Sequence, residues 1–278
     1  MSYDRKLIDV GGSAISTIDV GYGPAVVLAS GFLCDGYSWL PQIELLATQY
    51  RVIVPELWGH GLSGPLPTDV GSMRDVARQY LELFDALEID QCTIAGVSMG
   101  GMWGAELALM APERVSGLVL MDTSLAAEPA ATHAAYMGLL DAVEQHRGFP
   151  EPVIAAAAPL FFSSAADDRD PALKAEFVAR LRSWNPRRVV DSVVPLGRLI
   201  FDRRDALAEL SALTMPVIVA TGAEDQARSI AEGRAMAARI DCSFVEIPGS
   251  GHTPSLEAPE FVNSLLTEFL ALQLSDQR

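Results

Sequence analysis

The sequence predicts a doubly wound α/β fold, and three observations support it. Short apolar, β-prone runs alternate with helix-like segments along most of the chain. Several of these runs are continuous, such as AVVLAS, RVIVP, GLVLM and PVIVAT, as expected for parallel strands that are covered on both faces. The segments between them are long enough to form helical crossovers. Together these features are typical of a parallel sheet with helices on both sides.

The individual elements follow from the same patterns. β-rich apolar composition predicts strands over 14–20, 25–30, 51–54, 92–95, 117–121, 216–221 and 242–247. Helix-like spacing of apolar residues predicts helices over 39–49, 72–87, 102–110, 227–238 and 259–274.

Residues 124–213 interrupt this alternation, because they contain helical stretches and prolines but no convincing strand. These helices either pack beside the sheet or form a cap inserted after a core strand. We favour the cap, since an insertion at the carboxyl end of a strand lies where α/β sheets bind ligands. The predicted domains are therefore a core of 1–123 and 214–278 and a helical cap of 124–213.

Composition limits the classes of partner. The chain has 278 residues, of which half are hydrophobic and a fifth are charged, as in folded proteins. A net charge of −16 argues against nucleic acid and anionic membranes as partners. No apolar run approaches the length of a membrane span, and the N-terminal segment lacks the apolar region of a signal peptide. We expect a small-molecule partner; the oligomeric state stays open, a homo-oligomer included.

Cysteine and histidine spacing argues against a metal site. The three cysteines are scattered along the chain, which indicates reduced thiols and a cytoplasmic location. The sequence contains neither C-x-x-C nor H-E-x-x-H. We therefore expect no metal and no cofactor.

The stretch IAGVSMGG at 94–101 is the most informative motif. It contains G-x-S-x-G between a predicted strand and a predicted helix, the context of a nucleophile elbow. The five-residue pattern alone is a weak signal, so the flanking elements carry the prediction. They make Ser98 the candidate nucleophile. Cys34 is a weaker alternative, because no glycine elbow surrounds it.

A serine hydroxyl needs a base, and histidine suits this role because its pKa lies near neutral pH. His60 lies in a glycine-flanked turn, where a structural role is expected. His133 and His146 fall in the helical region 124–213, where packed or solvated histidines are usual. His252 follows the strand 242–247 in a glycine-rich loop, from which it can reach Ser98. His252 is therefore the predicted base.

The base needs an acid to orient it. Asp225 follows the strand 216–221 and is the favoured candidate, with the adjacent Glu224 expected to face elsewhere. Asp122, at the end of the strand 117–121, is a rival whose alternative role is to cap a turn. The order Ser, Asp, His along the chain is the one expected after such an elbow.

Backbone N–H groups are expected to stabilise an oxyanion. One donor is the residue after the nucleophile, Met99. The other lies in the loop after the strand 25–30, where we choose Phe32 and keep Leu33 as the second choice.

At this point the chain resembles the α/β-hydrolase superfamily over nearly its whole length. The matching segments are SGFLCDGYSW at 30–39, ELWGHGLSG at 56–64, GVSMGG at 96–101, APERVSGLVLMDT at 111–123, PVIVATGAED at 216–225 and GSGHTPSLEAPEFV at 249–262. The resemblance is closest to the small-ester branch, which holds enol-lactonases, carboxylesterases and cofactor-free haloperoxidases. It implies a mostly parallel sheet of eight strands and the same roles for Ser98, Asp225, His252, Phe32 and Met99.

Two positions depart from the family pattern. Ser30 replaces the histidine that usually begins the oxyanion loop, and Glu56 replaces an aspartate before the glycine-flanked turn. Neither performs chemistry in this scheme, so the departures concern support of the loop and the choice of substrate.

The predicted function is a serine hydrolase that cleaves a small carboxylic ester or lactone through an acyl-enzyme. An apolar pocket is expected to be lined by Leu33, Tyr136, Phe161, Phe162 and Trp184. The same three residues can also support haloperoxidase or perhydrolase chemistry, or hydrolysis of a carbon–carbon bond. A non-catalytic ligand receptor on the same fold is the alternative of another class.

Overall fold

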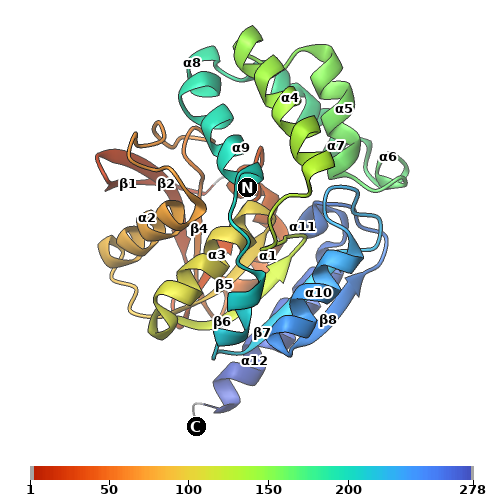
Figure 1. The fold of residues 1–278 in the computed structure, drawn as a ribbon. Helices are drawn as coiled ribbons and strands as arrows, with labels where there is room; N and C mark the ends of the chain where they lie inside the picture. The colour runs from red at the N-terminus through yellow and green to blue at the C-terminus, as the bar shows by residue number, and fades with distance from the viewer. Residues whose placement is uncertain (1–2, 277–278) are drawn as a thin grey trace.

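The computed structural model describes residues 3–276, and these form a single central sheet flanked by helices (Figure 1). The strands are β1 Lys6–Val10, β2 Ser13–Val20, β3 Ala25–Ala29, β4 Arg51–Pro55, β5 Cys92–Val97, β6 Val115–Met121, β7 Val217–Gly222 and β8 Ser243–Ile247. Their order in the sheet is β1-β2-β4-β3-β5-β6-β7-β8. Within the described chain β2 runs antiparallel to both of its neighbours, β1 and β4, and all other strand pairs are parallel. The predicted α/β fold and its mostly parallel sheet of eight strands are confirmed.

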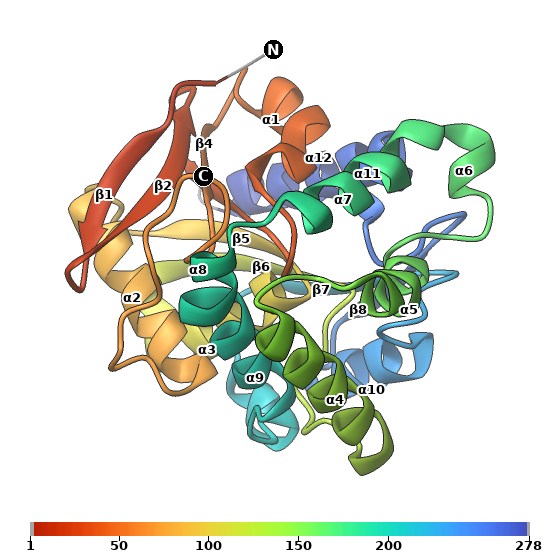
Figure 2. The ribbon, with the colours of Figure 1, turned by 90° about the horizontal axis from the view of Figure 1, so that it is seen from above.

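Helices cover both faces of the sheet, as the buried strands require. The core helices are α1 Leu40–Leu46, α2 Met73–Ala86, α3 Met99–Met110, α10 Ile230–Ile240, α11 Pro254–Glu257 and α12 Pro259–Asp276. One apolar cluster joins α2, α3 and α10 to one face, and a second joins α1 and α12 to the other. Figure 2 shows these two groups on opposite sides of the strands.

The segment between β6 and β7 is helical in the structure. It contains α4 Ala130–His146, α5 Glu151–Phe161, α6 Ala166–Arg169, α7 Pro171–Ser183, α8 Pro186–Arg188 and α9 Val194–Phe201. Figure 1 shows α4, α5, α7 and α8 grouped above the sheet. These helices have two small apolar clusters of their own. The division into core and cap at residues 123 and 214 stays a prediction.

β1 and α3 are among the elements that differ from the sequence expectation. β1 is absent from the predicted strands, because it is an edge strand with a mostly exposed, mixed sequence, KLIDV. Helix α3 begins at Met99, three residues before the predicted start, because the chain turns directly from strand to helix at Ser98.

No helix within residues 3–276 combines the length and the apolar character that crossing a membrane requires.

Candidate active site

Ser98 occupies a strained turn between β5 and α3. Its φ of 53° and ψ of −119° lie outside the conformations that a non-glycine residue ordinarily adopts. The turn is held on both sides of the residue: the Ser98 N–H donates to the Met121 carbonyl at 2.9 Å, and the Thr123 hydroxyl donates to the Ser98 carbonyl at 2.7 Å. Neighbouring β6 therefore fixes the backbone that presents the hydroxyl.

The glycines on either side of Ser98 are required by close backbone contacts. A Cβ at Gly96 would collide with the backbone of Gly100, and a Cβ at Gly100 would collide with the Ala29 carbonyl. Glycine is the residue that tolerates such approach. The G-x-S-x-G spacing thus follows from the sterics of this turn.

His252 and Asp225 meet at the same end of the sheet, after β8 and β7. Nδ1 of His252 lies 2.8 Å from Oδ2 of Asp225, and both side chains are buried. The other carboxylate oxygen of Asp225 accepts the N–H groups of Ala227 at 2.7 Å and Arg228 at 2.9 Å. Burial acts to raise the pKa of Asp225, but His252 and these hydrogen bonds hold it below its ordinary value.

Ser98 and His252 line one cavity, so the structure brings the predicted nucleophile and base to the same space. The Ser98 hydroxyl makes no hydrogen bond within the described residues. Catalytic hydrogen bonds often tighten only when substrate is bound, so this geometry is compatible with a base at His252.

The two rival acids have other contacts. Glu224 points away from His252 and accepts the N–H and the hydroxyl of Ser164, at 2.9 and 2.6 Å. Asp122 is fully buried, and its Oδ1 accepts the Gly222 N–H at 2.7 Å. Burial and then the neighbouring Asp225 carboxylate raise the pKa of Asp122 well above its ordinary value. Asp122 therefore holds a proton more tightly than Asp225 does.

Asp122, Asp225 and His252 also form the one cluster of possible metal ligands within the described part of the chain. One donor atom from each lies within 4.8 Å of the others. Two of the three groups are already joined by the His252–Asp225 hydrogen bond, which is a contact between an N–H and a carboxylate. This arrangement suits proton transfer better than a cation, and the absence of a metal stays an expectation.

The loop after β3 lies against Ser98. A Cβ at Gly31 would lie 3.3 Å from the Ser98 Cβ, which places the loop beside the nucleophile. The Leu33 N–H donates to Nε2 of His60 at 3.1 Å, whereas the Phe32 N–H has no partner within the described chain. Met99 is the first residue of α3, so its N–H has no acceptor within the helix. The geometry favours Phe32 over Leu33 as the second oxyanion donor.

His60 has the structural role expected from its turn. Its Nδ1 lies 2.9 Å from the Trp58 carbonyl, and its Nε2 accepts the Leu33 N–H, so the proton resides on Nδ1. Burial lowers the pKa of His60 to about 4. This histidine is thus neutral at ordinary pH and holds the loop after β3 in place.

The two departures from the family pattern support the same loops. Glu56 is buried and accepts the N–H groups of Gly36 at 3.3 Å and Leu62 at 3.0 Å, while Arg5 forms an ion pair with it. Ser30 lies 3.4 Å from the Ser38 hydroxyl within the same loop region. Glu56 therefore ties the loop after β3 to the glycine-flanked turn.

A cavity of about 100 Å³ opens beside Ser98 and His252. Of the residues predicted to line it, Leu33, Tyr136 and Phe161 do so, together with Phe32. The Phe161 ring stands edge-on to His252, with ring centroids 5.6 Å apart. The rest of the lining is largely aliphatic and comes mainly from α4, α5 and α9.

Phe162 and Trp184 do not line this cavity, contrary to the sequence prediction. Both Phe161 and Phe162 contact the Phe177 ring, but only Phe161 also borders the cavity, while Phe162 is buried in the apolar cluster around Phe177. Trp184 lies behind Phe149, with ring centroids 5.6 Å apart, and its indole N–H donates to the Gly59 carbonyl. It lines a separate hollow beside His60.

The remaining candidate nucleophile and bases lie elsewhere. His133 contacts Asp202 at 2.7 Å near the surface, and His146 contacts the Ala142 carbonyl within α4. Burial raises the pKa of the Cys34 thiol to about 11, which disfavours the reactive thiolate.

Two side chains near the site were absent from the sequence prediction. Glu257 is buried and accepts the N–H groups of Gly251 and Ser163, both at 2.8 Å, which links the His252 loop to the end of α5. Arg228 lines the cavity, three residues after Asp225. Both residues lie close in the sequence to His252 or Asp225, which is the one hint that the sequence offers. Residue spacing alone does not show where a side chain points.

Comparison with known proteins gives consistent relatives. Residues 24–259 match the family model described as the alpha/beta hydrolase fold. A 3-oxoadipate enol-lactonase of Acinetobacter baylyi is 24% identical over 247 residues, which are 89% of this chain and 88% of that protein. RutD of Klebsiella pneumoniae, whose name proposes carbamate hydrolysis, is 30% identical over 256 residues, which are 90% of this chain and 92% of RutD.

A solved structure agrees with these relatives. A thermophilic esterase from Thermogutta terrifontis superimposes with a TM-score of 0.85 and 28% identity, covering 97% of this chain and 99% of the esterase. The match of the family model spans most of the sequence and contains the elbow, the acid loop and the histidine loop. The chain belongs to the alpha/beta hydrolase fold family.

Proposed function

We propose that the protein is a serine hydrolase that cleaves a small carboxylic ester or lactone. The observation that carries this proposal is the convergence of three features on one cavity. They are a serine on a strained strand-to-helix turn, a histidine beside it, and a buried carboxylate 2.8 Å from that histidine. Relatives named as an enol-lactonase and an esterase support the same class of bond.

The mechanism proceeds by acyl transfer. The Ser98 hydroxyl attacks the ester carbonyl carbon while His252 takes its proton through Nε2. Asp225 accepts the hydrogen bond from Nδ1–H, which holds the tautomer and stabilises the imidazolium. The N–H groups of Phe32 and Met99 donate to the oxyanion. His252 then gives its proton to the leaving alkoxide, and the carbon–oxygen bond breaks to leave an acyl-Ser98.

Water completes the cycle. His252 removes a proton from water, the hydroxide attacks the acyl carbon, and the proton returns to Ser98 as the acid product leaves. The largely apolar lining of the cavity lowers the local dielectric constant, which strengthens the electrostatic contacts to the reacting atoms.

The test is labelling with a fluorophosphonate together with hydrolysis of p-nitrophenyl acetate. Wild type is expected to be labelled at Ser98 and to turn over the ester, and Ser98→Ala to do neither. Asp225→Asn is expected to lower kcat by roughly 10³–10⁴-fold, because the wrong tautomer of His252 then prevails. An unlabelled wild type, or Ser98→Ala with undiminished turnover, would falsify the assignment.

A further inference from the structure

The candidate cavity has one charged corner that the hydrolytic mechanism does not use. Apart from Ser98 and His252, two polar side chains line it within the described residues, Tyr136 from α4 and Arg228 from the loop before α10. All the others are apolar. A polar corner in an otherwise apolar cavity is how binding sites fix the orientation of a ligand.

Arg228 is held by two carboxylates, but some of its N–H donors have no acceptor among the described residues. Its Nη2 donates to Oε2 of Glu128 at 2.7 Å and its Nη1 to Oε1 of Glu232 at 3.3 Å. A guanidinium has five N–H donors, so three remain without an acceptor among the described residues. Arg228 is only 4% exposed, and it lines the cavity, so a bound molecule there is the natural acceptor.

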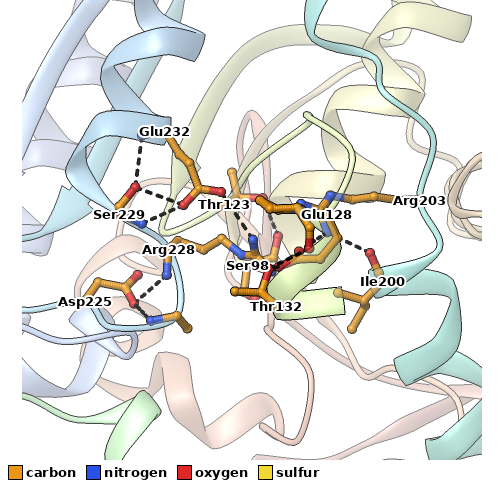
Figure 3. Close-up of polar contacts among 12 residues, drawn as sticks. Ser98, Thr123, Glu128, Thr132, Ile200, Arg203, Asp225, Arg228, Ser229 and Glu232 are labelled. Carbon is orange, nitrogen blue, oxygen red and sulfur yellow. Dashed lines mark hydrogen bonds and ion pairs between the residues drawn. The ribbon is translucent and has the colours of Figure 1, made fainter. Parts of the chain in front are cut away.

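Two buried guanidinium groups meet at one buried carboxylate behind Arg228. Figure 3 shows Glu128 between two guanidinium groups, those of Arg228 and Arg203. Both donate to the same oxygen of Glu128 at 2.7 Å, and both side chains are at most 5% exposed. Nε and Nη2 of Arg203 have no partner among the described residues. Two buried cations thus share one buried carboxylate.

Glu232 is the second carboxylate that Arg228 contacts. Its side chain is 29% exposed, and it also accepts the N–H and the hydroxyl of Ser229 at the start of α10. Water and these contacts reduce its effect on Arg228. Because N–H donors buried without an acceptor are costly, the corner favours a ligand oxygen, such as that of an anion, that accepts from Arg228.

Tyr136 adds a second donor. Its ring stacks on Phe201 with centroids 4.3 Å apart, and its hydroxyl makes no hydrogen bond within the described residues. A guanidinium and a phenol on different elements, both facing one cavity, can donate together to the two oxygens of a carboxylate.

We infer that the substrate carries a carboxylate remote from the scissile bond, and that Arg228 and Tyr136 bind it. This inference rests on the hydrolase function proposed above. The substrate class is then a monoester of a short dicarboxylic acid, or a lactone that bears a carboxylate.

The experiment compares two methyl esters with acyl chains of equal length. Monomethyl glutarate ends in a carboxylate, and methyl valerate ends in a methyl group. Wild type is expected to give a higher kcat/KM for monomethyl glutarate, by roughly 10-fold or more, since a hydrogen bond to a charged group contributes that much discrimination. Methanol release measures both rates.

Variants then test whether Arg228 and Tyr136 cause the preference for monomethyl glutarate. Arg228→Gln is expected to lower the glutarate-to-valerate ratio of kcat/KM by roughly 10–100-fold, mainly through KM. Tyr136→Phe removes one hydroxyl and is expected to lower the ratio by a smaller factor. Arg198→Gln is the matched control, because this arginine of α9 pairs with Asp141 and Glu144 outside the cavity and leaves the ratio unchanged.

The outcomes separate the two proposals. If wild type hydrolyses neither ester faster than Ser98→Ala, the hydrolase function fails. If wild type hydrolyses methyl valerate as well as monomethyl glutarate, the hydrolase stands and the carboxylate site is wrong. An unchanged ratio in both Tyr136→Phe and Arg228→Gln also overturns the site. If Arg228→Gln does not fold, the comparison of the two esters in wild type and in Tyr136→Phe still tests the carboxylate site.

Discussion

Nε2 of His60 accepts the Leu33 N–H at 3.1 Å, so a buried histidine fixes the loop that faces the nucleophile. This contact consumes the Leu33 donor, while the Phe32 N–H has no partner among the described residues. It requires a neutral imidazole, because a protonated Nε2 cannot accept. The contact therefore ties the loop after β3, which holds the proposed oxyanion donor Phe32, to a titratable group.

The first prediction concerns pH and stability. His60 has a pKa of about 4 in the folded protein, below the value near 6.5 of an unfolded chain. The unfolded state therefore binds the proton first. The His60 contribution is fully present above pH 6.5 and is lost as the pH falls towards 4, amounting to about 3 kcal/mol. Urea unfolding at several pH values measures the free energy of unfolding, which should fall less over this pH range in His60→Gln than in wild type. Parallel plots of this free energy against pH would contradict the role of His60.

The second prediction concerns the charge of Asp122. Burial and the neighbouring Asp225 favour the protonated form of Asp122, so Asp122→Asn is expected to remove no charge beside His252 and to leave the acidic limb of kcat/KM against pH where it is. If Asp122 were ionised, the same substitution would remove a negative charge beside His252 and move this limb to lower pH by about one unit. The pH profile of wild type and variant on one ester distinguishes the two cases. Asp202→Asn, on the surface, serves as the control.

A third prediction tests the sterics of the elbow. Gly96→Ala should destabilise the protein by about 3 kcal/mol, because its Cβ would collide with the backbone of Gly100. Gly138 in α4 is exposed, and a Cβ added there would meet no atom within 4 Å, so Gly138→Ala should stabilise by about 0.5–1 kcal/mol. Denaturant unfolding of both variants provides the measurement. Equal effects would mean that the tight turn is not the reason for glycine.

A fourth prediction separates two adjacent phenylalanines. Phe161→Ala widens the cavity and should shift ester preference towards longer acyl chains. Phe162→Ala should leave that preference unchanged but lower the free energy of unfolding by about 3 kcal/mol, because its ring packs in the core beside Phe177. A chain-length series of p-nitrophenyl esters and a urea titration check both. A shift of preference in Phe162→Ala would place that ring in the cavity after all.

The sequence by itself determined the features that depend on local chemistry. Continuous apolar runs indicated buried parallel strands, and the spacing of Gly96, Ser98 and Gly100 indicated the elbow, because both follow from sterics within a few residues. The chain order of Ser98, Asp225 and His252 was also readable, since each follows a strand. The edge strand β1 was not, because its mixed, exposed residues resemble a loop.

Only the tertiary structure decided which side chains meet. It paired His252 with Asp225, buried Asp122 so that its pKa is raised, and used the Leu33 N–H on His60. It placed Phe161 but not Phe162 in the lining of the cavity, and it brought Arg228 and Tyr136 to the same cavity. These outcomes depend on distances and side-chain directions between segments far apart in the chain. Residue spacing does not contain that information.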